Sequence, residues 1–194
     1  LAASAVPAQT VLSDWVPVFK GVEHAAGTNT PGTGAFWNLQ VVHCLRVDLT
    51  DPDIRLFASP RVTNYTVGYR ETAGYSATNL LRKYSLQAVV NANQFYLPGS
   101  SGGPSYTVPE GTVFNVAGLF MSQGEVVSQQ TSSDDAAALL FTTNNTASFV
   151  PTNWPARDTT GIFTAVAGPY AILVNGVNVG SNYINSRDSI HGIE

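Results

Sequence analysis

Residues 41–49, which read VVHCLRVDL, decide the fold. The odd positions of this stretch are apolar apart from His43, and the even positions mix apolar, polar and charged side chains. Alternation with a period of two is typical of a β-strand that buries one face. We therefore expect a half-buried strand here, and the turn residues Asp51-Pro52-Asp53 predict an antiparallel return over residues 54–58.

Turn signals further along the chain extend this β pattern. Residues 113–121 and 125–128 flank Gln123-Gly124, and residues 138–142 and 147–150 flank Asn144-Asn145. The strongest signal is Asn175-Gly176 between residues 171–174 and 177–179, because Asn-Gly readily adopts the positive φ angles of a two-residue hairpin turn. The sequence therefore predicts three hairpins.

One helix is expected among the strands. Ser76 or Thr78 can cap its first N–H groups, and Arg82 and Lys83 suit the negative end of its dipole. Its apolar stripe consists of Ala77, Leu80, Leu81 and Tyr84. The short apolar run over residues 86–90 predicts an interior strand. Together these elements predict an α+β fold, mostly antiparallel β-sheet with hairpins and at least one helix.

The composition excludes several classes of protein. The 194 residues include 9 Lys and Arg against 13 Asp and Glu, and the formal charge of -4 excludes a nucleic-acid binder built on a basic face. A single cysteine, Cys44, cannot form an internal disulfide, and no Cys/His spacing resembles a zinc site. No apolar run approaches the roughly 20 residues that a membrane span requires.

The start of the chain predicts export. Residues 1–8 read LAASAVPA, a run of small residues similar to the tail of a cleaved export signal. We expect a flexible segment over residues 1–14, a single domain from residue 15 to residue 194, and a periplasmic or extracellular location. No repeat or linker divides the chain into two domains.

The most informative candidate site is the corner at residues 91–96, Asn-Ala-Asn-Gln-Phe-Tyr, which follows the predicted interior strand and precedes a Gly- and Ser-rich loop. Binding groups are often presented where a strand ends in a loop. Amides exchange directional hydrogen bonds with sugar hydroxyls, and aromatic faces cover the apolar C–H patches of a sugar. The alternative is a turn in which the asparagines bond their own backbone.

Other polar residues favour structural roles. Arg70-Glu71-Thr72 can bring a charge pair to a pocket, but exposed ion pairs are common. Asp134-Asp135 suits a solvated turn better than a cation site, and His43 suits a hydrogen-bonded core position better than a catalytic base. No nucleophile elbow, zinc-protease motif, P-loop or dinucleotide-binding motif occurs. The acids suited to glycosidic acid/base chemistry include Glu71, Glu110, Asp158, Asp188 and Glu194.

The order of these segments resembles the phosphodiester glycosidase family. Two motifs carry the resemblance. Family members typically have Asn-Gly-Gly-Phe-Phe where this chain has Asn91-Ala92-Asn93-Gln94-Phe95, and a Gly-Pro-x-Leu strand pair like the one that begins at Gly168-Pro169. The chain departs from the family where Asn93 replaces the second glycine, and it ends before the family's Pro-Arg-Thr and Asp-Gly-Gly-Gly-Ser segments.

The resemblance implies a glycoside hydrolase-like activity on the glycosidic bond of a sugar phosphodiester or related glycan, with an N-acetylglucosamine-type substrate. It implies that Glu71 orients groups or transfers a proton and that Arg70 meets a phosphate. The remaining implied substrate-binding residues are Asn91, Asn93, Gln94, Phe95, Tyr96, Gly168 and Pro169. It also implies a C-terminal companion fragment of the same protein that completes the catalytic domain.

Two other functions stay open on the residues alone. The same amides and aromatics would serve a non-catalytic carbohydrate- or cell-wall-binding module, and a structural β-rich domain would tolerate them in its loops. No cofactor is predicted, and the involvement of a divalent metal stays open.

Overall fold

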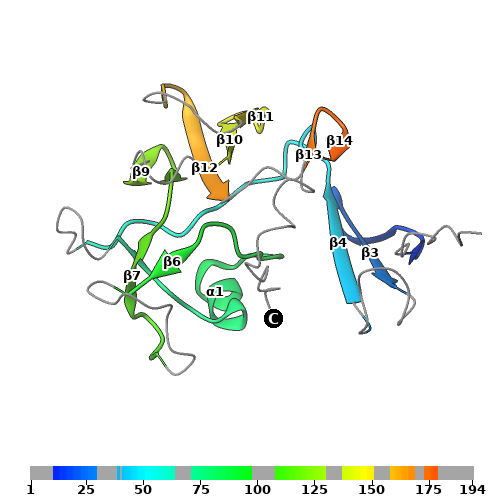
Figure 1. Cartoon of the computed structure of the whole chain (residues 1–194), viewed down its shortest axis with the longest axis horizontal. Helices are drawn as coiled ribbons and strands as arrows, with labels where there is room; N and C mark the ends of the chain where they lie inside the picture. Colours follow the sequence, from blue (N-terminus) through cyan, green and yellow to red (C-terminus); the bar gives the residue numbers. More distant parts are fainter. Residues whose placement is uncertain are drawn as a thin grey trace, which may run out of the picture. The chain divides into compact units, whose positions relative to one another are not determined.

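The computed structural model describes residues 11–29, 39, 41–63, 71–97, 108–129, 137–150, 158–168 and 173–178. The chain divides into two compact units, Leu1–Ile54 and Arg55–Glu194, called here the N-terminal and C-terminal units. Most of the described elements are antiparallel strands, with one short helix among them (Figure 1). The predicted α+β fold, predominantly β, is therefore confirmed.

The N-terminal unit is built on the central strand β3 (Val22–Thr28). Strands β1 (Val11–Leu12) and β2 (Val16–Phe19) pair one edge of β3 in succession, and β4 (Val41–Val47) pairs the other edge over seven residues. Figure 1 shows β3 and β4 side by side. The prediction of a strand here is confirmed, but the prediction that it buries one face is wrong, because the side chains of β4 are exposed except for the half-buried Cys44.

The predicted return strand over residues 54–58 is also wrong. These residues form no strand, and β4 pairs instead with β3, which precedes it in the chain. In the C-terminal unit, the carbonyls of this stretch accept side-chain hydrogen bonds: Ser122 Oγ donates to Ala58 O at 2.6 Å and Thr164 Oγ1 donates to Leu56 O at 3.3 Å. The stretch is therefore fixed by hydroxyl groups rather than by a strand ladder.

A five-stranded sheet forms the core of the C-terminal unit. Its strand order is β11 (Ala147–Val150), β10 (Ala137–Thr142), β12 (Ile162–Gly168), β8 (Phe120–Ser122) and β9 (Glu125–Ser128). One cluster of buried apolar side chains from this sheet and from the residue before β8 contains Leu119, Met121, Ala138, Leu140, Val150, Ala165 and Ala167, and a second contains Phe120 and Val127 of the sheet with Ala58 and Val116. Burial of these side chains stabilises the five-stranded sheet.

A smaller sheet in the same unit has the order β5 (Thr72–Ala73), β7 (Val113–Val116), β6 (Phe95–Tyr96). The hairpin of β13 (Leu173–Val174) and β14 (Val177–Asn178) follows β12 in the chain. All three predicted hairpins are confirmed, with positive φ angles at Gln123, Gly124, Asn145, Asn175 and Gly176. The predicted strand over residues 113–121 is broken between β7 and β8, where Gly118 has a φ of 76°.

The predicted helix is confirmed as α1 (Ala77–Tyr84) with Ser76 at its N-cap. The Ser76 side chain makes no capping bond. Instead, the carboxylate of Glu110 accepts the Ser76 N–H, at 3.1 Å from each oxygen. At the other end, Ser85 takes the left-handed conformation and the Leu86 N–H donates to Leu81 O at 2.9 Å.

The interior strand predicted over residues 86–90 is wrong. These residues form no strand, and Val90 is 80% exposed. Ser85 ends the helix in the left-handed conformation, and the Leu86 N–H donates to Leu81 O of the helix instead of pairing with a strand. An irregular segment, rather than a strand, therefore connects the end of α1 to the corner at residues 91–96.

Candidate functional site

Three segments that lie far apart in the sequence meet at β7 and the loop that follows it. Glu71 leads into β5, which pairs with β7 at Thr72 and Phe114. The corner at residues 91–96 includes β6, which pairs with β7 at Phe95 and Val116. The third segment is the end of β12, whose Ala167 N–H donates to Asn93 Oδ1 at 2.9 Å. The structure thus joins the corner at residues 91–96 to Ala167, the residue before Gly168.

Asn93 connects these segments through both the oxygen and the nitrogen of its side-chain amide. Besides accepting from Ala167, its Nδ2 group donates to Ala117 O at 2.8 Å and to Leu119 O at 3.1 Å. The side chain is buried. All of these partners are main-chain groups, so Asn93 fixes the ends of three segments and has little capacity left for a ligand.

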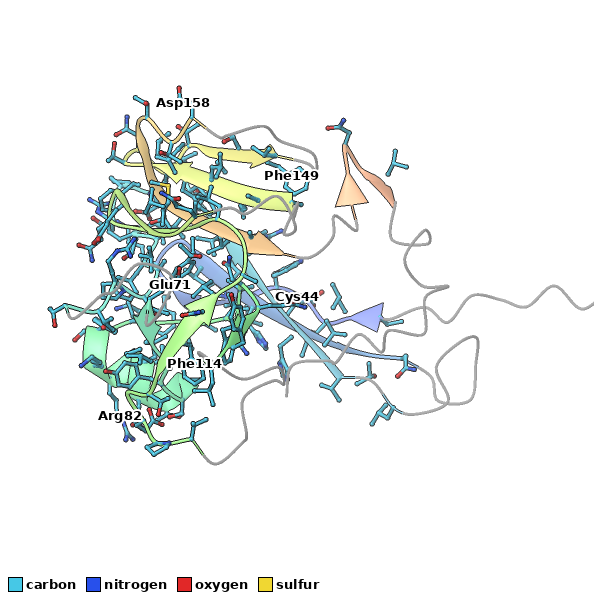
Figure 2. The ribbon with its side chains drawn as sticks, turned by 60° about the vertical axis from the view of Figure 1, so that its left-hand side comes forward. Cys44, Glu71, Arg82, Phe114, Phe149 and Asp158 are labelled. Carbon is cyan, nitrogen blue, oxygen red and sulfur yellow. The ribbon has the colours of Figure 1, made fainter. Side chains whose placement is uncertain are left out.

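Glu71 has a comparable role on the other side of β7. Its Oε2 atom accepts the Val116 N–H at 2.7 Å, and its own N–H donates to Phe114 O at 3.0 Å. The residue is buried, and Figure 2 labels it together with Phe114. The carboxylate therefore holds a main-chain donor of β7, which is a positioning role.

All residues of the corner except Asn93 are exposed, and the polar and aromatic ones are Asn91, Gln94, Phe95 and Tyr96. Ala117 N–H donates to Gln94 O at 2.8 Å, which continues the pairing of β6 with β7 by one residue. Successive residues of an extended chain point to opposite faces, so Gln94 and Tyr96 share one face and Phe95 lies on the other.

The two aromatic residues therefore have different surroundings. Phe95 packs edge-on against Phe114, with ring centroids 5.2 Å apart and planes at 79°. Tyr96 is 42% exposed, and it lies on the face that also carries Gln94. An amide and an aromatic ring on one exposed face form the pair that suits a sugar: hydrogen bonds to hydroxyls from the first and a surface for C–H groups from the second.

The other candidate residues divide into described and undescribed positions. Gly168 ends β12 beside Ala167, and a side-chain carbon added there would meet no atom within 4 Å. Arg70, Pro169, Asp134, Asp135, Asp188 and Glu194 lie outside the described residues. The prediction that His43 is a core residue is wrong, because its side chain is exposed on β4.

Two of the predicted acids are ionised rather than poised to donate a proton. Hydrogen bonding to Ser76 lowers the pKa of Glu110, and hydrogen bonding to Thr160 lowers the pKa of Asp158. A general acid in glycoside hydrolysis needs a raised pKa. Neither carboxyl is therefore suited to donate a proton at neutral pH.

The structure reveals contacts that the sequence did not indicate. Arg61 Nε donates to Glu125 Oε1 at 2.8 Å, and its Nη2 group donates to Val126 O, so this side chain binds the edge strand β9. Within the described ranges, no group of three or more His, Cys, Asp or Glu side chains is arranged to hold a metal ion. No helix in the described part of the chain is long and apolar enough to cross a membrane.

Comparisons of the chain with protein-family models, with curated proteins and with solved structures found no match.

Proposed function

We propose that this chain forms the substrate-binding part of a glycoside hydrolase that cleaves the glycosidic bond of a sugar phosphodiester. The proposal starts from the resemblance to phosphodiester glycosidases, whose two recognisable motifs here are the corner at residues 91–96 and the strand end at Gly168. The single observation that supports it is the hydrogen bond from Ala167 N–H to Asn93 Oδ1, which holds these two motifs together at 2.9 Å.

The proposed substrate contacts lie on the exposed face of the corner. The Gln94 amide donates to and accepts from sugar hydroxyls or phosphate oxygens, and the Tyr96 ring covers the sugar's C–H face. Asn91 offers a second exposed amide three positions earlier. Asn93 and Glu71 are positioning residues in this scheme, because both side chains are bonded to the main chain.

The proposed reaction is hydrolysis. The oxygen of a water molecule bonds to the anomeric carbon as the bond from that carbon to the phosphate oxygen breaks, and the phosphate leaves with the electron pair while the water's proton passes to solvent or a base. A phosphate leaving group needs little help from a general acid. Arg70 is the proposed phosphate ligand, because guanidinium groups bind phosphate through paired donors.

A second candidate is a carbohydrate-binding module without turnover. It is favoured by the state of the described acids, since Glu71 holds a main-chain N–H and the pKa values of Glu110 and Asp158 are lowered. The exposed amide and aromatic face would serve binding alone equally well.

Incubation of the protein with an aryl α-N-acetylglucosaminide and with a phosphodiester of N-acetylglucosamine 1-phosphate tests the proposal. Release of free sugar supports the hydrolase, and saturable binding without release supports the module. If the protein neither releases nor binds sugar at millimolar concentration, both candidate functions are contradicted. Tyr96→Ala should weaken kcat/KM or binding roughly 5- to 150-fold, the equivalent of one lost packing or hydrogen-bonding group. Phe149→Ala is the matched control, because Phe149 is 44% exposed on β11, away from the corner in sequence and in sheet (Figure 2).

A further inference from the structure

A pair of histidines lies on the sheet of the N-terminal unit and is not among the residues assigned to carbohydrate. In the register of β3 and β4, His24 is opposite Leu45 and His43 is opposite Ala26, so the two histidines are diagonal neighbours on one face. Their rings stack with centroids 5.2 Å apart and planes at 20°. The Nε2 atom of His24 and the Nδ1 atom of His43 are 3.0 Å apart.

We propose that these two nitrogens form a binding site for one divalent transition-metal ion, of the Cu²⁺ or Zn²⁺ class. The spacing is the main argument. Imidazole nitrogens bind such ions at about 2.0–2.1 Å, so two of them at angles of 90–110° around one ion are roughly 2.8–3.4 Å apart. The observed separation falls inside this range, and the ion needs only rotation of the rings so that both lone pairs point to it.

The protons balance in this exchange. In the metal-free pair, one facing nitrogen carries the N–H and the other accepts it. On metal binding, the donor ring moves its proton to its outer nitrogen through solvent, and both rings remain neutral imidazoles. Metal binding therefore competes with a single hydrogen bond between the two rings.

The surroundings of the two histidines leave room for an ion to enter, and among the described residues of β3 and β4 no Lys or Arg side chain shares their face. His43 is exposed and His24 is half-buried, so water can reach the pair and fill the remaining coordination positions. The charged residues of the same strands, Glu23 and Arg46, are directly opposite each other on the other face and bind each other at 2.6 Å. Arg46 also lies over the Trp15 ring, 4.6 Å from its centroid. These contacts occupy the Arg46 cation away from the histidine face.

The chemistry of the donors sets the selectivity. Neutral imidazole suits Cu²⁺, Ni²⁺ and Zn²⁺, with Cu²⁺ bound most tightly, whereas Mg²⁺ and Ca²⁺ prefer oxygen ligands. We therefore expect Cu²⁺ to bind more tightly than Zn²⁺, and Mg²⁺ to give no signal.

Isothermal titration of the 194-residue chain with Cu²⁺, Zn²⁺ and Mg²⁺ tests the site. The expected result is one equivalent of Cu²⁺ or Zn²⁺, with affinity reduced at least about tenfold in His24→Gln and in His43→Gln. His191→Gln is the matched control, because it removes the third histidine of the sequence and should leave affinity unchanged. Equal affinity in wild type and His43→Gln, or loss of binding in His191→Gln, would overturn the proposal.

A spectroscopic measurement on the wild-type chain avoids dependence on the folding of the variants. Substoichiometric Cu²⁺ should broaden the imidazole NMR signals of His24 and His43 before any other histidine signal, since paramagnetic broadening falls steeply with distance. Broadening of the His191 signals first, or no selective broadening, would contradict a site at this pair. The outcome is independent of any carbohydrate activity.

Discussion

Replacement of Asn93 by aspartate probes the junction of the candidate site with almost no change in shape. The substitution keeps the oxygen that accepts the Ala167 N–H, but it replaces the Nδ2 donor by an oxygen facing the carbonyls of Ala117 and Leu119, at 2.8 and 3.1 Å. Each buried carbonyl left without its donor costs about 1–3 kcal/mol, so Asn93→Asp should lower the free energy of unfolding by about 2–6 kcal/mol at pH 7.

The loss should depend on pH in a defined direction. The new carboxyl is buried against two carbonyl oxygens, so its pKa in the folded state is raised above the unfolded value of about 3.9. The penalty is then complete above the raised pKa and becomes smaller as the pH falls toward 3.9, where the protonated group can again donate to one carbonyl. Urea unfolding followed by circular dichroism at several pH values measures this trend.

Asn91→Asp is the matched control, because it adds the same charge two residues away at an exposed position. Its effect on the free energy of unfolding should stay within about 0.5 kcal/mol. Hydrogen exchange at the Ala117 amide, which donates to Gln94 O at 2.8 Å, locates the damage next to the lost bond to Ala117 O, since Asn93→Asp should increase exchange there and Asn91→Asp should not. The reasoning is refuted if the two variants have equal stability at pH 7.

Three further predictions test other contacts, one of them with a control substitution. Glu110→Ala should lower the midpoint of thermal unfolding at neutral pH. Hydrogen bonding to the side chain and then to the backbone N–H of Ser76, the N-cap of α1, lowers the pKa of Glu110 below its ordinary 4.5, so the stabilisation is complete above that value and the gap should close as the pH falls through the lowered pKa. Gly74→Ala should cost about 1–3 kcal/mol in urea unfolding because the added methyl overlaps the Phe114 ring, whereas Gly168→Ala has open space and should stay within about 0.5 kcal/mol. Glu71→Gln keeps a main-chain acceptor, so turnover and stability should remain near wild type, and loss of turnover alone would reveal proton transfer instead.

Features set by neighbouring residues could be predicted from the sequence. The turns at Gln123-Gly124 and Asn175-Gly176 form as expected because their positive φ angles are a local property of those residues. The position of α1 was also predictable, since its N-cap at Ser76 and the basic residues of its last turn lie within the element itself.

Features set by distant partners could not be predicted from the sequence. The stretch 54–58 was expected to be a return strand, but its carbonyls accept hydrogen bonds from the distant hydroxyl groups of Ser122 and Thr164. The pairing of His24 with His43 depends on the register of β3 against β4, which neither strand encodes alone.

The candidate site shows the same division. Amides and aromatics at the corner were identifiable from residue type, and the exposed Gln94 and Tyr96 agree with a binding surface. The role of Asn93 was not identifiable, because its three partners come from the chain after β7 and from β12. None of the described acids with a shifted pKa is suited to donate the proton of the proposed reaction, since the pKa values of Asp48, Glu110 and Asp158 are all lowered.

Whether the exposed face of the corner binds a sugar phosphate is tested most directly by an NMR titration of the isotope-labelled protein with N-acetylglucosamine 1-phosphate. We expect saturable chemical-shift changes of the Gln94 side-chain amide and of the backbone amides of residues 94–96, with no comparable change around Phe149. Shifts absent at millimolar ligand, or present only at residues remote from the corner, would contradict it.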